Sequence, residues 1–163
     1  EGGKEMMREH HTVYLAGKVR MNGWRNAFGY RDNVDFYSME KVEDFANYLF
    51  KYNDSLSITG PTIIGCDHGC YHGPEAHGCG IDLCGCGGHN LTREDVFNIC
   101  KRQIDRAEIV FAYIDSYDCF GTIAEIGYAY AQGKSILIKF ATEELRRDMW
   151  FVDQILADRK SVV

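Results

Sequence analysis

The chain has 163 residues, of which 45% are hydrophobic and 26% are charged. This length and balance are typical of one globular domain with its own hydrophobic core. The formal net charge of −6 argues against a nucleic-acid polymer as partner, because such a surface is usually basic. No apolar run reaches roughly 18 residues, so we expect no membrane partner. The seven cysteines, an odd number, favour reduced thiols and a cytoplasmic location over a disulfide framework.

The first half of the chain contains two predicted strands and one predicted helix. Residues 1–11 are predicted to be a tag remnant or a flexible arm outside the fold. An apolar run ending in a Gly turn predicts a strand over 12–17, and 18–31 is predicted to be a loop or a short helix. Helical spacing of apolar residues predicts a helix over 39–52, and a weaker pattern predicts a strand over 57–64. Residues 65–90, rich in Gly, Cys and His, have no periodicity and predict one long loop.

In the second half of the chain, predicted helices and strands alternate more regularly. Helices are predicted over 94–106, from 121 to about 132 and over 143–158, and buried strands over 109–114 and 135–140. Alternation of this kind predicts an α/β fold: a single-domain doubly wound parallel sheet of the Rossmann or flavodoxin-like type. We expect about four to five strands, with right-handed crossovers and helices on both faces, in one domain over 12–163.

Three carboxylates follow the strand at 109–114 and would lie at the carboxyl edge of the sheet, where open α/β folds bind ligands. Asp115 and Asp118 stand in the loop, and Glu125 is predicted in the first turn of the next helix. One interpretation of Glu125 is a capping box in which Thr122 caps the helix.

The alternative interpretation of Glu125 is catalytic. Ile123, Ile126, Gly127 and Tyr130 are predicted to face the sheet, which directs Glu125 away from it. A helix N-terminus would keep the carboxylate ionised and available as a nucleophile.

Tyr14 is a further candidate, because it lies late in the first strand, just before Gly17. If that strand is a parallel neighbour of the strand at 109–114, its Tyr14 end and the Asp115 end meet at the same rim. The alternative is a packed aromatic ring whose hydroxyl is hydrated.

Together these residues resemble the nucleoside 2-deoxyribosyltransferase family and its nucleotide N-hydrolase relatives. The resemblance rests on YLAG in the first strand and on ID-x-x-D-x-x-GT-x-x-EIG-x-A-x-A-x-GK, and covers 12–20 and 104–140. It implies an enzyme, a transferase or a hydrolase, that cleaves the N-glycosidic bond of a nucleoside or nucleotide, and a homo-oligomer built from dimers with shared sites.

The resemblance also assigns roles to individual residues. It implies that Glu125 attacks the anomeric carbon to form a glycosyl-enzyme ester, that Tyr14 orients Glu125, and that the sugar then passes to a second base or to water. Asp115 or Asp118 would bind sugar hydroxyls; Cys119 and Phe120 intervene before the Gly-Thr pair, so both aspartates stay candidates. The substrate-binding candidates at this edge also include Gly17, Gly121 and Thr122.

Arg20 and Arg25 follow the first strand. They are interpreted either as solvated loop charges or as ligands of a 5′-phosphate, because guanidinium groups suit phosphate and this loop faces the same crevice. A phosphate site there would make the substrate a nucleotide.

The loop at 65–90 contains nine Cys and His residues. Its cysteines could bind zinc, but their spacing lacks a pair of Cys-x2-Cys knuckles, so we favour a Gly-rich loop lining the site and no cofactor. The zinc candidates are Cys66, Cys70, Cys79, Cys84 and Cys86. Asp67 and His68 are the residues of this loop most typical of a site, and His68 is a candidate acid that protonates the leaving base.

Other functions stay open at this point. The chain could be a module that binds or hydrolyses nucleotide or NAD-derived ligands, or a zinc-stabilised domain. Trp150 and Phe151 are predicted either to pack across a two-fold interface or to pack the last helix on the sheet.

Overall fold

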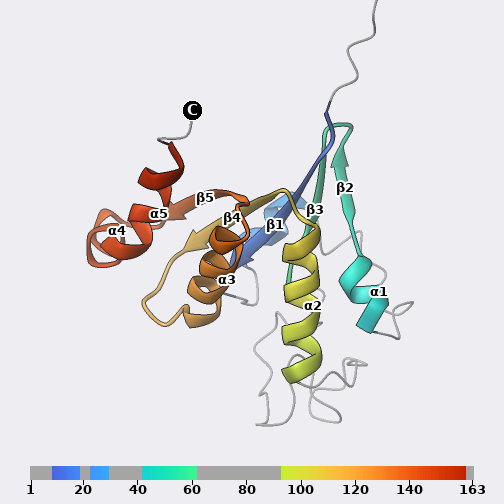
Figure 1. Cartoon of the computed structure of the whole chain (residues 1–163), viewed down its shortest axis with the longest axis horizontal. Helices are drawn as coiled ribbons and strands as arrows, with labels where there is room; N and C mark the ends of the chain where they lie inside the picture. The colour runs from blue at the N-terminus through green and yellow to red at the C-terminus, as the bar shows by residue number, and fades with distance from the viewer. Residues whose placement is uncertain (1–8, 19–22, 30–41, 62–92, 161–163) are drawn as a thin grey trace, which may run out of the picture.

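The computed structural model describes residues 9–18, 23–29, 42–61 and 93–160. The predictions for Arg20, for Asp67 and His68, and for the five candidate zinc cysteines concern residues outside these ranges. The strands are β1 (His11–Gly17), β2 (Phe50–Asn53), β3 (Leu56–Thr59), β4 (Ile109–Ile114) and β5 (Ser135–Phe140). The helices are the short 3-10 helix η1 (Trp24–Phe28), α1 (Val42–Asn47), α2 (Arg93–Arg106), α3 (Phe120–Ala131), α4 (Glu143–Asp148) and α5 (Trp150–Lys160), most of them labelled in Figure 1.

The five strands form one sheet in the order β2-β3-β1-β4-β5. The strands β3, β1, β4 and β5 are parallel, and only β2 pairs antiparallel, in a hairpin with β3. The predicted α/β fold with a mostly parallel sheet is confirmed. The chain moves from β1 to β3 on one side and later to β4 on the other, and such a reversal of strand order opens a ligand crevice at the carboxyl edge.

The strand β1 lies between β3 and β4, which explains its nearly continuous burial. In the β1–β4 register Tyr14 lies beside Val110 and Gly17 beside Tyr113. The carboxyl end of β1 therefore meets the carboxyl end of β4, and the prediction that the two strands share one rim is confirmed.

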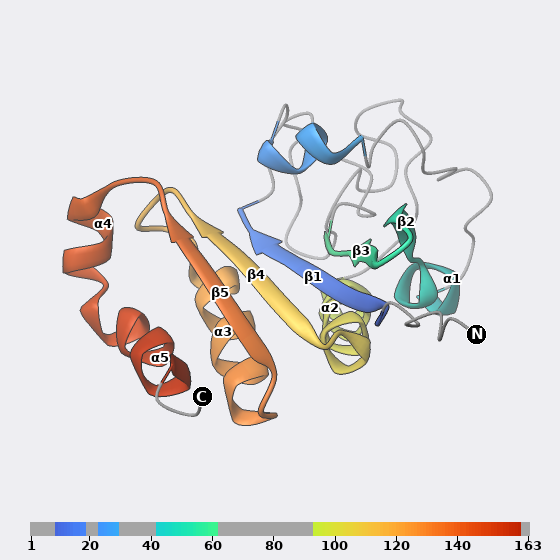
Figure 2. The ribbon, with the colours of Figure 1, turned by 90° about the horizontal axis from the view of Figure 1, so that it is seen from above.

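The helices α2 and α3 lie on one side of the sheet, with α1 packed beside α2, and η1 lies on the other side (Figure 2). The buried side chains Ile104 from α2 and Ile126 from α3 belong to the same core cluster as Tyr14, Val110 and Ile114. Glu125 directly precedes Ile126 on α3, so this core fixes how α3 presents Glu125 to α2.

Two predicted boundaries in the first half of the chain were wrong. The strand β1 begins at His11, inside the predicted arm, and the ring of His11 bonds to Glu108 at 2.6 Å. The predicted helix over 39–52 ends at Asn47 and is followed by β2. After β2 the Asn53 side chain accepts from the Ser55 backbone N–H at 2.8 Å, which turns the chain toward β3.

The last predicted helix is two helices. Thr142 caps α4, its side chain accepting from the backbone N–H of Leu145 at 3.1 Å, and the chain changes direction at Met149 before α5. None of the helices in the described part of the chain is long and apolar enough to cross a bilayer.

Candidate active site

Tyr14 and Glu125 meet in the structure. Tyr14 is fully buried in β1, and its hydroxyl donates to Glu125 Oε1 at 2.5 Å. The two residues are separated by 111 positions in the chain, so the pair exists only because α3 packs over β1. A bond this short to a carboxylate is typical of a charge-assisted hydrogen bond.

The position of Glu125 excludes the capping box. The helix α3 begins at Phe120, and the residue at its cap, Cys119, makes no side-chain hydrogen bond to it. Thr122 lies inside the first turn with its side chain buried. Glu125 therefore stands in the second turn, and the expectation that it lies in the first turn was wrong. The alternative interpretation, in which Thr122 caps the helix, is excluded as well.

The carboxyl of Glu125 is harder to ionise than an exposed one. Burial raises its pKa from 4.5 to about 7, although the hydrogen bond from Tyr14 and the nearby charge of Arg25 both act to lower it. The expectation that the helix N-terminus keeps this carboxylate ionised fails, because that effect falls off within the first turn. Burial raises the pKa of Tyr14 well above its usual value, with Cys100 and Glu125 adding to the shift.

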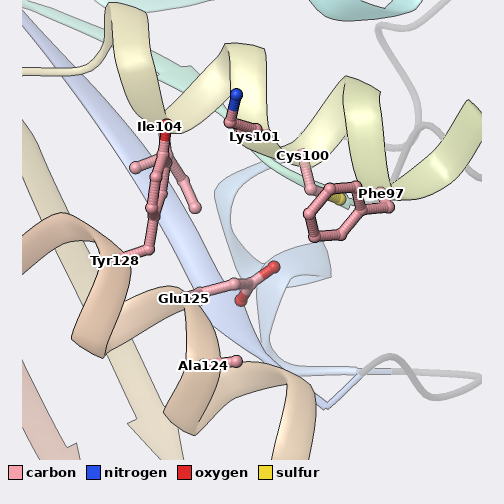
Figure 3. Close-up of a pocket in the computed structure, with 7 residues that line it drawn as sticks. All are labelled: Phe97, Cys100, Lys101, Ile104, Ala124, Glu125 and Tyr128. Atoms are coloured by element: carbon pink, nitrogen blue, oxygen red, sulfur yellow. The ribbon is translucent and has the colours of Figure 1, made fainter. Parts of the chain in front are cut away.

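A pocket of about 150 Å³ opens between α2 and α3 beside Glu125 (Figure 3). The helix α2 contributes residues at helical spacing, and α3 contributes two adjacent residues and a third one turn later. The lining consists of Phe97, Cys100, Lys101, Ile104, Ala124, Glu125 and Tyr128. Most of this wall is apolar. Burial raises the pKa of the Cys100 thiol to about 12, so the thiol is neutral at physiological pH.

The side of α3 that faces the sheet differs from the prediction at one residue. Ile126 is buried, and Ile123 and Tyr130 pack against the core as partly buried residues. Gly127 is exposed, with open space around it, and Ala129 is buried in its place. Glu125 lies at the border of this face: its carboxyl accepts from the Tyr14 hydroxyl of β1 and also lines the pocket toward α2 (Figure 3), so the prediction that it is directed away from the sheet holds only in part.

Arg25 is 2% exposed and lies under the carboxyl end of β1. Its guanidinium donates to the carbonyl oxygens of Leu15 at 3.0 Å, Gly17 at 2.7 Å and Lys18 at 3.4 Å, and it lies 4.9 Å from the ring centroid of Trp24. The interpretation of Arg25 as a solvated charge was wrong, because its side chain is buried and its guanidinium donates to backbone carbonyls. Its predicted phosphate contact stays a prediction.

Gly17 allows this arrangement by its lack of a side chain. A Cβ at this position would lie 2.9 Å from Trp24 Nε1 and 3.1 Å from the carbonyl oxygen of Tyr113. The first distance would force the Trp24 side chain to shift, and the second would require the Tyr113 backbone to give by a few tenths of an ångström. Gly17 is therefore required for close packing at the rim, and its predicted contact with substrate stays a prediction.

The loop between β4 and α3 carries the remaining carboxylates. Asp115 directly follows β4 and is partly exposed, and Asp118 is exposed and forms an ion pair with Lys18. The hydrogen bond from Lys18 lowers the pKa of Asp118. Gly121 is exposed with open space beside it. Both aspartates lie at the carboxyl edge, and the choice of sugar-binding residue between them stays open.

Several residues of the pocket were not predicted from the sequence. Phe97, Lys101 and Tyr128 were not singled out as site residues, although Phe97, Lys101 and Ile104 follow the spacing of one helix face. Lys18, which directly follows Gly17, was missed as the partner of Asp118. Among residues 9–18, 23–29, 42–61 and 93–160, no three His, Cys, Asp or Glu side chains are grouped to hold a metal ion.

A comparison of the chain with protein-family models, curated proteins and solved structures finds no match in any of the three.

Proposed function

We propose that this protein cleaves the N-glycosidic bond of a nucleoside or nucleotide, with Glu125 as the nucleophile. The observation that carries the proposal is the bond between the buried Tyr14 hydroxyl and Glu125 at 2.5 Å, beside a pocket. A buried carboxylate with one oxygen held by a hydroxyl is oriented for attack with the other oxygen. The resemblance of 12–20 and 104–140 to the nucleoside 2-deoxyribosyltransferase family supports the same roles.

The reaction has two steps. Glu125 Oε2 bonds to the anomeric carbon while the bond to the base breaks, and the electron pair of that bond goes to the base nitrogen. A second base or water then attacks the anomeric carbon, gives its proton to the released base and frees Glu125, which gives overall retention. Asp115 or Asp118 binds sugar hydroxyls in this scheme. Transfer and hydrolysis share the nucleophile and differ only in the acceptor.

The pKa of about 7 for Glu125 sets the pH dependence of this mechanism. The nucleophile must be ionised, so activity rises with pH through about 7 and reaches a plateau above it. A Glu125 that instead donated a proton would give the opposite limb, with activity falling over the same range. The sign of the limb therefore separates the two roles.

The test is base release from a panel of deoxynucleosides, ribonucleosides and their 5′-phosphates, followed by chromatography with and without a second free base. Base exchange identifies a transferase, and free sugar alone identifies a hydrolase. Glu125→Gln should reduce turnover by about a thousandfold or more, whereas Glu94→Gln, an exposed carboxylate on α2, should not. Ligand-induced thermal stabilisation without any product would favour a binding module and contradict the proposal.

We also propose that the protein is cytoplasmic and forms a homodimer. Trp150 and Phe151 are 63% and 72% exposed, which excludes the interpretation that they pack α5 on the sheet. Exposed aromatic residues of this kind are enriched at protein interfaces. Light scattering on the wild type and on Trp150→Ala should show a dimer that the substitution weakens; a wild-type monomer would contradict the proposal.

A further inference from the structure

The pocket beside Glu125 has an aromatic residue at each end. Phe97 on α2 and Tyr128 on α3 lie at opposite ends of it, and Glu125 lies between them (Figure 3). Phe97 is 67% exposed, although a phenyl group on a helix surface loses favourable burial in that position. An exposed ring at the rim of an apolar pocket is suited to stacking against a planar ligand.

The side chain of Tyr128 is held in place by hydrogen bonds. Its hydroxyl donates to Asp105 Oδ1 at 2.6 Å, and Gln132 Nε2 donates to the same oxygen at 2.6 Å. Lys134 Nζ also donates to the backbone carbonyl of Asp105 at 2.7 Å. These bonds tie α3 to the end of α2 and hold the width of the pocket. A pre-organised wall of this kind favours ligands of one size.

The size and lining of the pocket limit what fits. The volume is about 150 Å³, and an apolar protein cavity of about that volume accommodates one benzene ring. Ile104 and Ala124 supply further apolar surface, and Cys100 adds a neutral thiol, which is a weak hydrogen-bond donor. The pocket therefore matches a flat single ring better than the larger fused ring of a purine.

We propose that this pocket binds a single six-membered heteroaromatic ring, a pyrimidine or a pyridine, and that Phe97 is the residue on which the ring stacks. The inference rests on the proposed function, because the ring would be the base that leaves when Glu125 attacks the sugar. It makes Phe97 a specificity-determining residue and names single-ring N-glycosides as the substrate class.

The experiment is direct binding of free bases to the full chain by calorimetry, with thymine, nicotinamide and adenine as probes. The wild type should bind thymine or nicotinamide at least about tenfold more tightly than adenine. Phe97→Ala should weaken that binding by about tenfold, since stacking of a base on an aromatic ring contributes to affinity at this level. Phe97→Tyr keeps the ring and should keep the binding. Tyr52→Ala, which removes an exposed aromatic residue of β2 outside the pocket lining, is the matched control.

The outcomes separate the inference from the proposed function. Equal or tighter binding of adenine, no binding of any base, or full affinity in Phe97→Ala would overturn the inference. Single-ring binding without base release from any N-glycoside would overturn the proposed function and the substrate class, and would leave only the ring-binding role of the pocket and of Phe97. Equal cleavage of purine and pyrimidine nucleosides would overturn the inference and leave the proposed function standing.

Discussion

Burial of the Glu125 carboxyl should make the folded protein less stable as pH rises. The folded-state pKa of about 7 lies above the ordinary value of 4.5, so between these values the folded protein keeps a proton that the unfolded chain releases. The stability contributed by the protonated group is complete below about pH 4.5, declines through this window and stays low above about pH 7. Glu125→Gln cannot ionise and should not show this decline.

The magnitude follows from the shift. The difference between 4.5 and about 7 is about 2.5 pKa units, and each unit corresponds to about 1.36 kcal/mol. The full effect is therefore about 3 kcal/mol of unfolding free energy, which is a large part of the stability of a domain of this size. Between about pH 5 and about pH 8 the part that should be observed is about 2 to 3 kcal/mol.

Urea unfolding of the wild type and of Glu125→Gln at these two pH values measures the effect. Other titrating groups are common to both proteins, so the difference between the two free energies isolates Glu125. Glu125→Gln should become more stable relative to the wild type at the higher pH. A difference that stays within about 0.5 kcal/mol at both pH values would refute the assignment of Glu125 as a buried carboxyl, and Glu94→Gln should follow the wild type.

Three further substitutions test other parts of the structure. Tyr14→Phe removes a hydrogen bond that lowers the pKa of Glu125. Because a hydrogen bond to a charged group contributes about 1.5 to 3 kcal/mol, the acid limb of the pH profile of kcat/KM should move up by about one to two pH units. An acid limb that does not move would contradict the contact between Tyr14 and Glu125. Arg25→Ala removes the guanidinium donors from buried carbonyls at the end of β1 and should cost about 3 kcal/mol or more in urea unfolding. A cost below about 1 kcal/mol would mean that water replaces the guanidinium. Thr142→Ala removes the cap of α4 and should cost about 1 kcal/mol, and an unchanged unfolding midpoint would show that α4 does not depend on its cap.

The secondary structure was predictable where the local sequence pattern and the tertiary packing favour the same kind of element. The strands β4 and β5 and the helix between them were predicted closely, because burial periodicity changes clearly from strand to helix along 109–140. The strand β2 was missed, since Phe50–Asn53 continues a helical pattern and becomes a strand only by pairing with β3. The local preference of these four residues is weak, and a tertiary partner decides it.

For the candidate site too, some features were predictable from the sequence and others depend on the tertiary structure. Tyr14, Glu125 and the aspartates were identifiable from residue types, spacing and resemblance, because strand ends and helix starts are local features. The bond between Tyr14 and Glu125 joins residues 111 positions apart, and the raised pKa of Glu125 comes from burial under α2. The role of Arg25 as a donor to β1 carbonyls likewise depends on where η1 packs. Residue identity supplies the chemical groups, whereas burial and the distances between groups are properties of the packed chain alone, and these decide which of the groups can act together.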